Sequence, residues 1–213
     1  MANSAVRSPS VGPLPGDQAL AIAGLLVNRI GGPSVKPYQP DGLWNEIGGG
    51  GAYVQDHGDK LYRRSLYTFW RRTIPPPSMA NFDASAREYH VVRPVVTNTP
   101  LQALDLMNDV AYLEAARVFA QRVIKEGGST PSERISYAFR LATARLPKPA
   151  AAAILLDAFR QNLDQFKSKP DAALKYLSYG EYPRDASFDV SELAAYTSVT
   201  SLILNLNETV MKE

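Results

Sequence analysis

A series of helix-starting signals is spaced through the second half of the chain, and it constrains the fold more than any other feature. Thr99 precedes Pro100, and residues 130–133 read Thr-Pro-Ser-Glu. A short polar side chain before a helix accepts hydrogen bonds from free backbone N–H groups, and proline fits the first helical position. Residues 189–192 (Asp-Val-Ser-Glu) repeat this arrangement. We therefore expect several separate helices after residue 99.

Apolar periodicity supports the same helices. They are predicted from Pro100 to the stop at Gly127, from Pro131 through Leu146, from Pro149, from Pro170, and from Leu193 to Asn205. The apolar stripe that begins after Pro149 is the cleanest in the chain and consists of Leu155, Leu156, Phe159, Leu163 and Phe166. The chain is therefore predicted to be mainly α, with helical hairpins in its C-terminal half.

The N-terminal half shows no comparable order. Residues 1–16 are mostly Ser, Pro, Gly and Ala, which predicts a disordered lead-in, and residues 17–213 suffice for a single domain. Asp17 begins a short amphipathic helix that is expected to reach Ile30. Prolines and the four glycines at 48–51 then interrupt every pattern. We expect an irregular, Pro/Gly-rich N-terminal half that wraps on the helical half.

One more helix is predicted from Leu61 to Ile74, with aromatic residues on one face and arginines on the other. Together with an earlier loop it supplies a candidate aromatic and basic interaction surface: Tyr38, Trp44, Tyr67, Trp70, Arg64, Arg71 and Arg72. Aromatic rings and guanidinium groups on one surface favour anions or nucleic acid. A solvated basic face over an aromatic core face is the simpler interpretation and the one the pattern favours.

Arg63 is the exception in this helix, because it falls on the apolar side. A buried guanidinium needs a partner, and Asp83 or Glu88 would supply it. The polar residues around it form a candidate pocket: Arg63, Asp83, Arg87, Asn98 and Gln102. Thr97, Asn98 and Thr99 also precede a helix start, where an anion site and simple capping are the two alternatives.

Composition excludes several classes of site. The chain has no cysteine, so thiolate zinc sites, iron–sulfur clusters, a cysteine nucleophile and covalently attached haem are all excluded. His57 lies between Asp56 and Asp59, where a solvated turn is favoured over a metal site. A net charge of +2 is not typical of a dedicated nucleic-acid binder. The sequence as it stands shows neither a bilayer-spanning run nor a signal peptide, which predicts a cytoplasmic protein.

Several ordered motifs follow one family pattern. They are GGPSVKPYQP at 31–40, YRRSLYTFW at 62–70, PPPSM at 75–79, FDA with RE at 82–88, TNTPLQAL at 97–104, and ELAAYT with a later LN at 192–205. This pattern closely resembles the planctomycete-type domain of unknown function at the C-terminus of large, cytochrome-c-associated secreted proteins. The resemblance covers about residues 17–213.

The resemblance implies a context rather than a reaction. Such domains follow a companion domain, often with a c-type haem domain further upstream, on chains that are exported to the cell envelope. Any haem would therefore sit on an upstream or partner domain. Tyr89 and His90 stand where relatives often show a cysteine, which argues against a thiol role. The start of the chain departs from the family lead-in, so the chain looks like the C-terminal piece of a longer protein.

Three functions follow from these observations. The leading expectation is a non-catalytic interaction or scaffold module within a haem-associated envelope protein. The alternative is part of an oxidoreductase or saccharide-processing enzyme that passes electrons to a separate haem domain, with the candidate pocket as its site. The third is anion or nucleic-acid binding through the arginine-rich helix. The residues assign no reaction to the chain.

Overall fold

The computed structural model describes residues 15–44, 52–71, 73–84 and 97–210. These residues are mainly α-helical, as the sequence predicts, and they contain no strand beyond isolated bridges. The α-helices are α1 (Pro15–Ala23), α2 (Pro77–Asn81), α3 (Pro100–Asn108), α4 (Val110–Glu126), α5 (Pro131–Thr143), α6 (Pro149–Ser168), α7 (Pro170–Tyr176), α8 (Val190–Leu204) and α9 (Asn207–Val210). Two 3-10 helices cover Gly58–Tyr62 and Ser65–Tyr67.

The helix starts predicted from the caps at Thr99, Thr130 and Asp189 are confirmed, whereas the first helix begins at Pro15 and not at Asp17. The Thr99 hydroxyl accepts a hydrogen bond from the Gln102 N–H, and the Gln102 side chain accepts one from the Thr99 N–H in return. Thr130 and Glu133 form the same reciprocal pair at the start of α5. Each cap satisfies backbone N–H groups that would otherwise lack partners, which sets where the helix begins.

Three predicted helices are shorter than expected, and one of them, α5, ends at Thr143 instead of Leu146. The helix after Pro100 is broken at Asp109, whose extended backbone ends α3 and whose carboxylate accepts the Ala111 N–H to start α4. The first helix ends at Ala23 instead of Ile30, because Gly24 adopts a φ of 82° that a helix does not allow. As a result, Ile30 is exposed.

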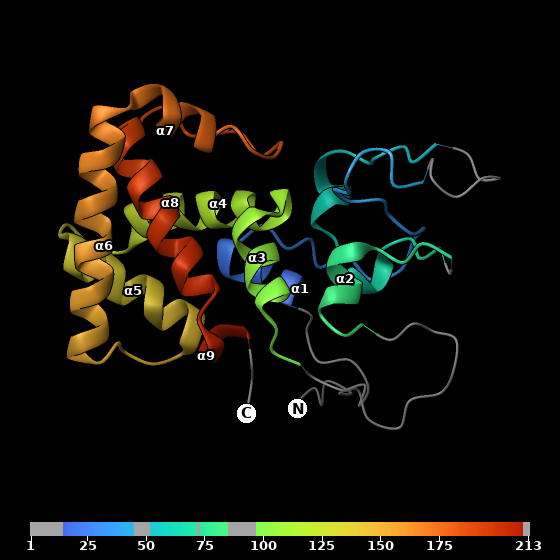
Figure 1. The fold of residues 1–213 in the computed structure, drawn as a ribbon, viewed down its shortest axis with the longest axis horizontal. Helices are drawn as coiled ribbons and strands as arrows, with labels where there is room; N and C mark the ends of the chain where they lie inside the picture. The colour runs from blue at the N-terminus through green and yellow to red at the C-terminus, as the bar shows by residue number, and fades with distance from the viewer. Residues whose placement is uncertain (1–14, 45–51, 72, 85–96, 211–213) are drawn as a thin grey trace, which may run out of the picture.

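The core lies where α4 and α8 cross. Alanines on both helices, Ala115, Ala116, Ala194 and Ala195, are completely buried, and small side chains let two helix backbones approach closely. The Thr200 hydroxyl donates to the Ala116 carbonyl across this contact. Figure 1 shows α5, α6, α7 and α8 gathered on one side, while the irregular lobe (residues 24–44, 52–71 and 73–84), which includes α2, lies on the other.

The predicted helix from Leu61 to Ile74 is wrong. Apart from Arg72, which lies outside the described residues, the segment consists of the end of the first 3-10 helix, the second 3-10 helix and non-helical backbone. Val27 pairs with Arg63, and Val35 with Thr68, in isolated parallel bridges. The segment is rich in aromatic residues, which favour extended backbone. Its Tyr62 and Tyr67 carbonyls accept hydrogen bonds from the N–H groups of Val27 and Val35, and the Phe69 N–H donates to the Val35 carbonyl. Consequently Leu66 and Phe69, expected in the core, are 60% and 38% exposed.

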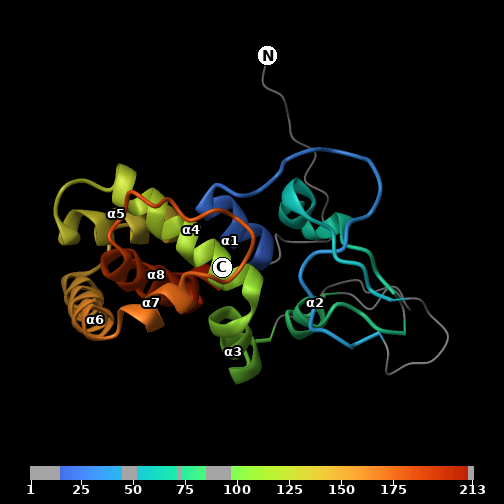
Figure 2. The ribbon, with the colours of Figure 1, turned by 90° about the horizontal axis from the view of Figure 1, so that it is seen from above.

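We call the helices α3 to α9 the bundle and residues 178–188 the clasp loop. A buried ion pair on α4 joins the bundle to the irregular lobe through the clasp loop. Glu114 is 1% exposed, and its Oε1 atom accepts hydrogen bonds from the Tyr62 hydroxyl (3.1 Å) and the Tyr182 N–H (2.5 Å). Arg117, 2% exposed, donates to the Tyr182 carbonyl (2.6 Å). Figure 2 shows the clasp loop passing over α4.

In the described part of the chain, every helix is too short or too polar to cross a membrane.

Candidate ligand-binding cavity

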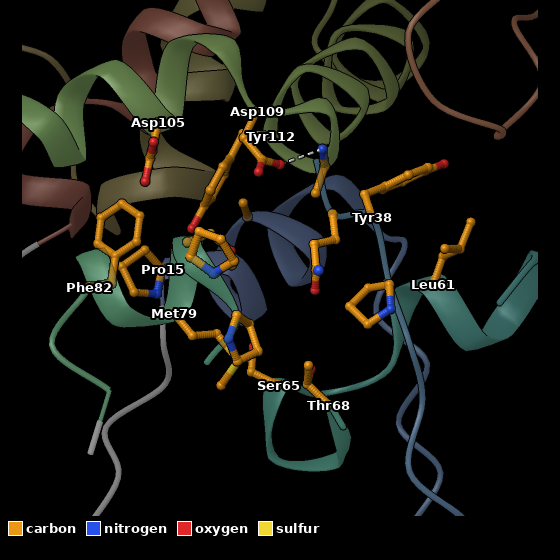
Figure 3. Close-up of a pocket in the computed structure, with 18 of the residues that line it drawn as sticks. Pro15, Tyr38, Leu61, Ser65, Thr68, Met79, Phe82, Asp105, Asp109 and Tyr112 are labelled. Atoms are coloured by element: carbon orange, nitrogen blue, oxygen red, sulfur yellow. Dashed lines mark hydrogen bonds between the residues drawn. The ribbon is translucent and has the colours of Figure 1, made fainter. Parts of the chain in front are cut away.

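A cavity of about 170 Å³ lies where α1, α2 and the junction of α3 and α4 meet the irregular lobe (Figure 3). Its lining combines aromatic and proline surfaces with a few polar side chains. The lining includes Tyr38, Gln39, Tyr53, Arg63, Ser65, Thr68, Met79, Phe82, Asp105, Asp109, Ala111 and Tyr112. Such a mixture is typical of small-molecule sites.

Two carboxylates stand at one end of the cavity, on the α3–α4 break. In Figure 3, Asp105 and Asp109 lie on either side of Tyr112. Asp105 accepts a hydrogen bond from the Asn81 side chain (2.6 Å), and Asp109 accepts the Ala111 N–H (2.8 Å). Burial raises the pKa of Asp109; the backbone N–H bonds oppose this shift, and the nearby Asp105 adds to it.

Burial and nearby negative charges also act on the pKa of Tyr112. Burial raises the pKa of its hydroxyl, and the negative charges of Asp109, Asp105 and Asp17 raise it further. The hydroxyl therefore stays protonated and available as a hydrogen-bond donor. This end of the cavity favours groups that donate hydrogen bonds or carry positive charge.

Arg63 lines the cavity as well and is only 4% exposed. Its Nη2 atom donates to the carbonyls of Arg29 (2.9 Å) and Gly31 (2.8 Å), and the guanidinium lies 3.9 Å from the ring centre of Tyr67. Its Nε and Nη1 atoms are buried without a hydrogen-bond partner. The predicted burial of Arg63 is confirmed.

The prediction that Asp83 is the partner of Arg63 is wrong, because the guanidinium donates to backbone carbonyls instead. Asp83 instead accepts hydrogen bonds from the backbone and hydroxyl of Thr97. Its own φ of 58° lies in the left-handed region. Glu88 lies outside the described residues.

Aromatic side chains form much of the remaining wall. Tyr53 donates from its hydroxyl to the Pro37 carbonyl (2.5 Å), and burial raises its pKa to about 12. The Tyr38 hydroxyl accepts the Glu181 N–H from the clasp loop (2.8 Å). Phe82 and Met79 lie on the α2 side, as Figure 3 shows. The clasp loop thus holds one wall of the cavity in place.

The structure divides the predicted polar pocket. Gln102 and Asp83 meet at Thr97, because the Gln102 amide donates to the Thr97 hydroxyl (3.1 Å) and Asp83 accepts from the same residue. Asn98 donates to Asn207 instead (2.9 Å). Arg63 lies in the cavity wall, and Arg87 lies outside the described residues. Asp83 and Gln102 therefore organise the chain before α3, and Arg63 contributes to the cavity.

The predicted interaction surface is also divided. Trp44 is buried, with the Lys36 ammonium 5.5 Å and the Arg71 guanidinium 5.0 Å from its ring centre. Arg63 covers Tyr67, and the clasp loop engages Tyr38. Arg64 is exposed, 3.9 Å from Asp17; Trp70 is half-buried, and Arg72 lies outside the described residues. These side chains mostly contact their own lobe.

His57 lies away from the cavity, on the surface. Its Nδ1 atom is 2.5 Å from Glu181 of the clasp loop. Residues 15–44, 52–71, 73–84 and 97–210 contain no group of three or more acidic or histidine side chains placed to hold a metal ion.

Sequence reasoning did not identify Gln39, Asp105, Asp109 or Tyr112 as site residues. The available signal was the polar pair Asn108–Asp109, which interrupts the apolar pattern of a predicted helix. A polar break inside a helix indicates a cap, and a cap can turn its carboxylate toward a cavity.

Replacing Asp109 by asparagine tests the electrostatics of the end of the cavity that holds Asp105 and Asp109. Because the folded-state pKa lies above the ordinary value of 3.8, the ionised carboxylate costs stability as pH rises through 3.8 toward the raised pKa. Asparagine caps a helix equally well and carries no charge. We expect Asp109→Asn to match the wild type below pH 3.8 and to exceed it near pH 7, measured by urea unfolding. Asp189→Asn, at the exposed cap of α8, is the control and should show no such gain; a gain for Asp109→Asn only at acidic pH would contradict the account.

Comparison with known families supplies the context for this cavity. Residues 16–159 match the PSD1 model, described as "Protein of unknown function (DUF1553)". The chain belongs to the PSD1 family. The resemblance to a planctomycete-type domain of unknown function is therefore confirmed. No curated protein and no solved structure matches the chain.

The PSD1 match contains the whole cavity lining except Pro15. It ends inside α6, so the clasp loop and α8 lie beyond it. The cavity is thus built within the PSD1 region of the chain, while one of its walls is held by a segment outside that region.

Proposed function

We propose that this PSD1 domain binds a small, polar organic molecule in the cavity between the bundle and the irregular lobe. The observation that carries the proposal is the cavity itself, about 170 Å³ in size and lined by aromatic rings, two carboxylates and the Gln39 amide, whose Nε2 atom is buried without a partner. An apolar cavity of about 150 Å³ holds a benzene ring, so the space suits a ligand of one ring or a similar chain.

Two features support a site that exists before the ligand arrives. The carboxylates are held by a helix cap and by Asn81, and the Tyr38 wall is held by the clasp loop. Preorganised groups lose little entropy on binding, which favours affinity.

A cavity-filling variant tests the proposal. Ala111 lines the cavity at the second position of α4, so Ala111→Leu places three additional carbon atoms in the space. A fragment library of ring-sized polar compounds is screened against the wild type by ligand-observed NMR and thermal shift. We expect hits for the wild type and a loss of binding for Ala111→Leu.

Ala150→Leu is the matched control, because Ala150 occupies the second position of α6 and is exposed. This variant should bind as the wild type does. A wild type without any hit, or hits that persist in Ala111→Leu, would overturn the proposal.

A second candidate function, the interaction module, is favoured by the outer face of α3. Leu101, Leu104 and Met107 are 50%, 57% and 49% exposed, and their spacing places them on one helix face. Exposed apolar groups that cluster in this way mark protein contacts. The resemblance suggests as partner a haem-bearing companion domain of the cell envelope.

Calorimetry with such a companion domain tests this second function. Leu104→Glu should weaken binding at least tenfold, since a buried carboxylate replaces an apolar contact. Leu146→Glu, at an exposed position outside α3, should leave binding unchanged. Equal affinities for the two variants would exclude the α3 face.

Two other functions were expected from the sequence: an enzyme that passes electrons to a haem domain, and binding through an arginine-rich helix. An enzyme that passes electrons to a separate haem domain would use the same cavity for its substrate. Binding through an arginine-rich helix finds no support, because Leu61 to Ile74 is not a helix and Arg63 is buried.

A further inference from the structure

We infer that the ligand of the cavity is a protonated amine on a small apolar body, and that Asp105, Asp109 and the Tyr112 hydroxyl hold its ammonium group. This inference rests on the proposed function and names the chemical class of the ligand. Two observations carry it: a buried hydroxyl that faces the cavity without a partner, and two carboxylates that lack a cation.

The Tyr112 hydroxyl is the first of these. The side chain is 6% exposed and lines the cavity, and its hydroxyl forms no hydrogen bond with any described residue. In Figure 3 its oxygen atom points away from α4, toward Pro15 and Met79. Gly16 also lines the cavity, and a methyl group added to it would lie 3.6 Å from the Tyr112 oxygen. Since buried hydroxyls normally have a partner, a ligand is the natural source of one here.

The second observation concerns the charges around Tyr112. Asp105 and Asp109 both lie close enough to raise the pKa of Tyr112. Within the described ranges, neither carboxylate forms an ion pair with a Lys or Arg side chain. Arg63 does not compensate them, because its guanidinium donates to backbone carbonyls that lie outside the lining. Carboxylates that are partly removed from water are normally paired with a cation, so this region favours a cationic ligand.

An ammonium group suits this region better than a metal ion. The described part of the chain offers no group of three acidic or histidine side chains placed to hold a metal. A primary ammonium donates three hydrogen bonds, which matches two carboxylates and one hydroxyl oxygen. The Phe82 and Tyr112 rings lie 6.0 Å apart, and aromatic faces attract cations. Proline rings and Met79 in the rest of the lining suit an apolar body.

Three probes test the inference with the wild-type chain: benzylamine, benzyl alcohol and benzoate. They share one ring and differ in the charge of the attached group. Dissociation constants are measured by calorimetry at moderate salt and pH 7, where an alkylamine is protonated. We expect benzylamine to bind at least about tenfold more tightly than benzyl alcohol, because its hydrogen bonds to carboxylates are charge-assisted. Benzoate should bind most weakly, since the aspartates repel it.

Two charge-removing variants show whether the aspartates cause this preference. Asparagine keeps an oxygen that can accept from Asn81 in Asp105→Asn, or cap α4 in Asp109→Asn. Each variant should lose most of the preference for benzylamine over benzyl alcohol. Asp164→Asn changes the net charge equally on the exposed surface of α6, and it should keep the preference.

Tyr112→Phe tests the hydroxyl. The change keeps the ring and removes no hydrogen bond between described residues, so the variant should fold as the wild type does. Its affinity for benzylamine should fall by about threefold or more, the effect of one lost hydrogen bond. Tyr179→Phe, at an exposed position of the clasp loop, is the control and should bind as the wild type does.

The outcomes separate this inference from the proposed function. Benzyl alcohol or benzoate binding as tightly as benzylamine would overturn the inference and leave a ligand site. A preference that persists in both aspartate variants, or an unchanged affinity in Tyr112→Phe, would overturn it as well. If library compounds bind and benzylamine does not, the inference alone fails; if nothing binds the wild type, both fail.

Discussion

Glu114→Ala should lower the free energy of unfolding by about 3–5 kcal/mol, the range observed when one member of a buried ion pair is removed. The change leaves Arg117 charged and buried, and burial already lowers the pKa of its guanidinium against the opposing charge of Glu114. It also removes the acceptor for the Tyr62 hydroxyl and the Tyr182 N–H. Urea unfolding followed by circular dichroism measures the loss.

The double variant Glu114→Met with Arg117→Met separates charge from packing. Replacing both charges by apolar side chains of similar length should recover the part of the loss that comes from the unpaired charge of Arg117, while the Tyr62 hydroxyl and the Tyr182 N–H remain without their acceptor. If Glu114→Ala unfolded at the same urea concentration as the wild type, the pair would not connect the bundle to the clasp loop.

Gly180→Ala should also be strongly destabilising, for two reasons. Gly180 has a φ of 83°, and left-handed backbone at a residue other than glycine costs about 1–3 kcal/mol. In addition, the new methyl group would overlap the Glu114 carboxylate, and overpacking costs a further 1–3 kcal/mol or so. Urea unfolding of Gly180→Ala measures the combined loss of unfolding free energy from both causes.

Gly24→Ala is a closely matched control. Gly24 has a φ of 82°, and nothing lies within 4 Å of the position that its methyl group would take. It should therefore show the cost of the backbone alone. If the two variants were equally destabilised, the overlap with Glu114 would not exist in solution.

Local signals predicted the helical half well. Thr99, Thr130 and Asp189 cap the helices they were expected to start, because a cap depends only on residues within one turn. The prediction of a helix from Leu61 to Ile74 was wrong because its conformation is not set locally. Its conformation depends on hydrogen bonds to residues 27–35, and a helical period in the side chains carries no information about such a partner.

The site was predictable only in part. Arg63 was identified as buried, because its position among apolar residues is a local property. Its carbonyl partners at Arg29 and Gly31 were not, since they come from a segment about thirty residues away whose path depends on tertiary packing. Asp105 and Asp109 reach the cavity only because the helix breaks between α3 and α4.

Because α8 packs on α4, the region that must fold together extends beyond the region that matches the PSD1 family. The matched region stops at residue 159, in the middle of α6, yet α8 covers the buried face of α4, and the clasp loop binds its ion pair. A fragment cut at residue 159 would expose that apolar face to water and leave Glu114 and Arg117 without Tyr182. Boundaries for expressing such domains are therefore better taken from helix packing than from sequence similarity.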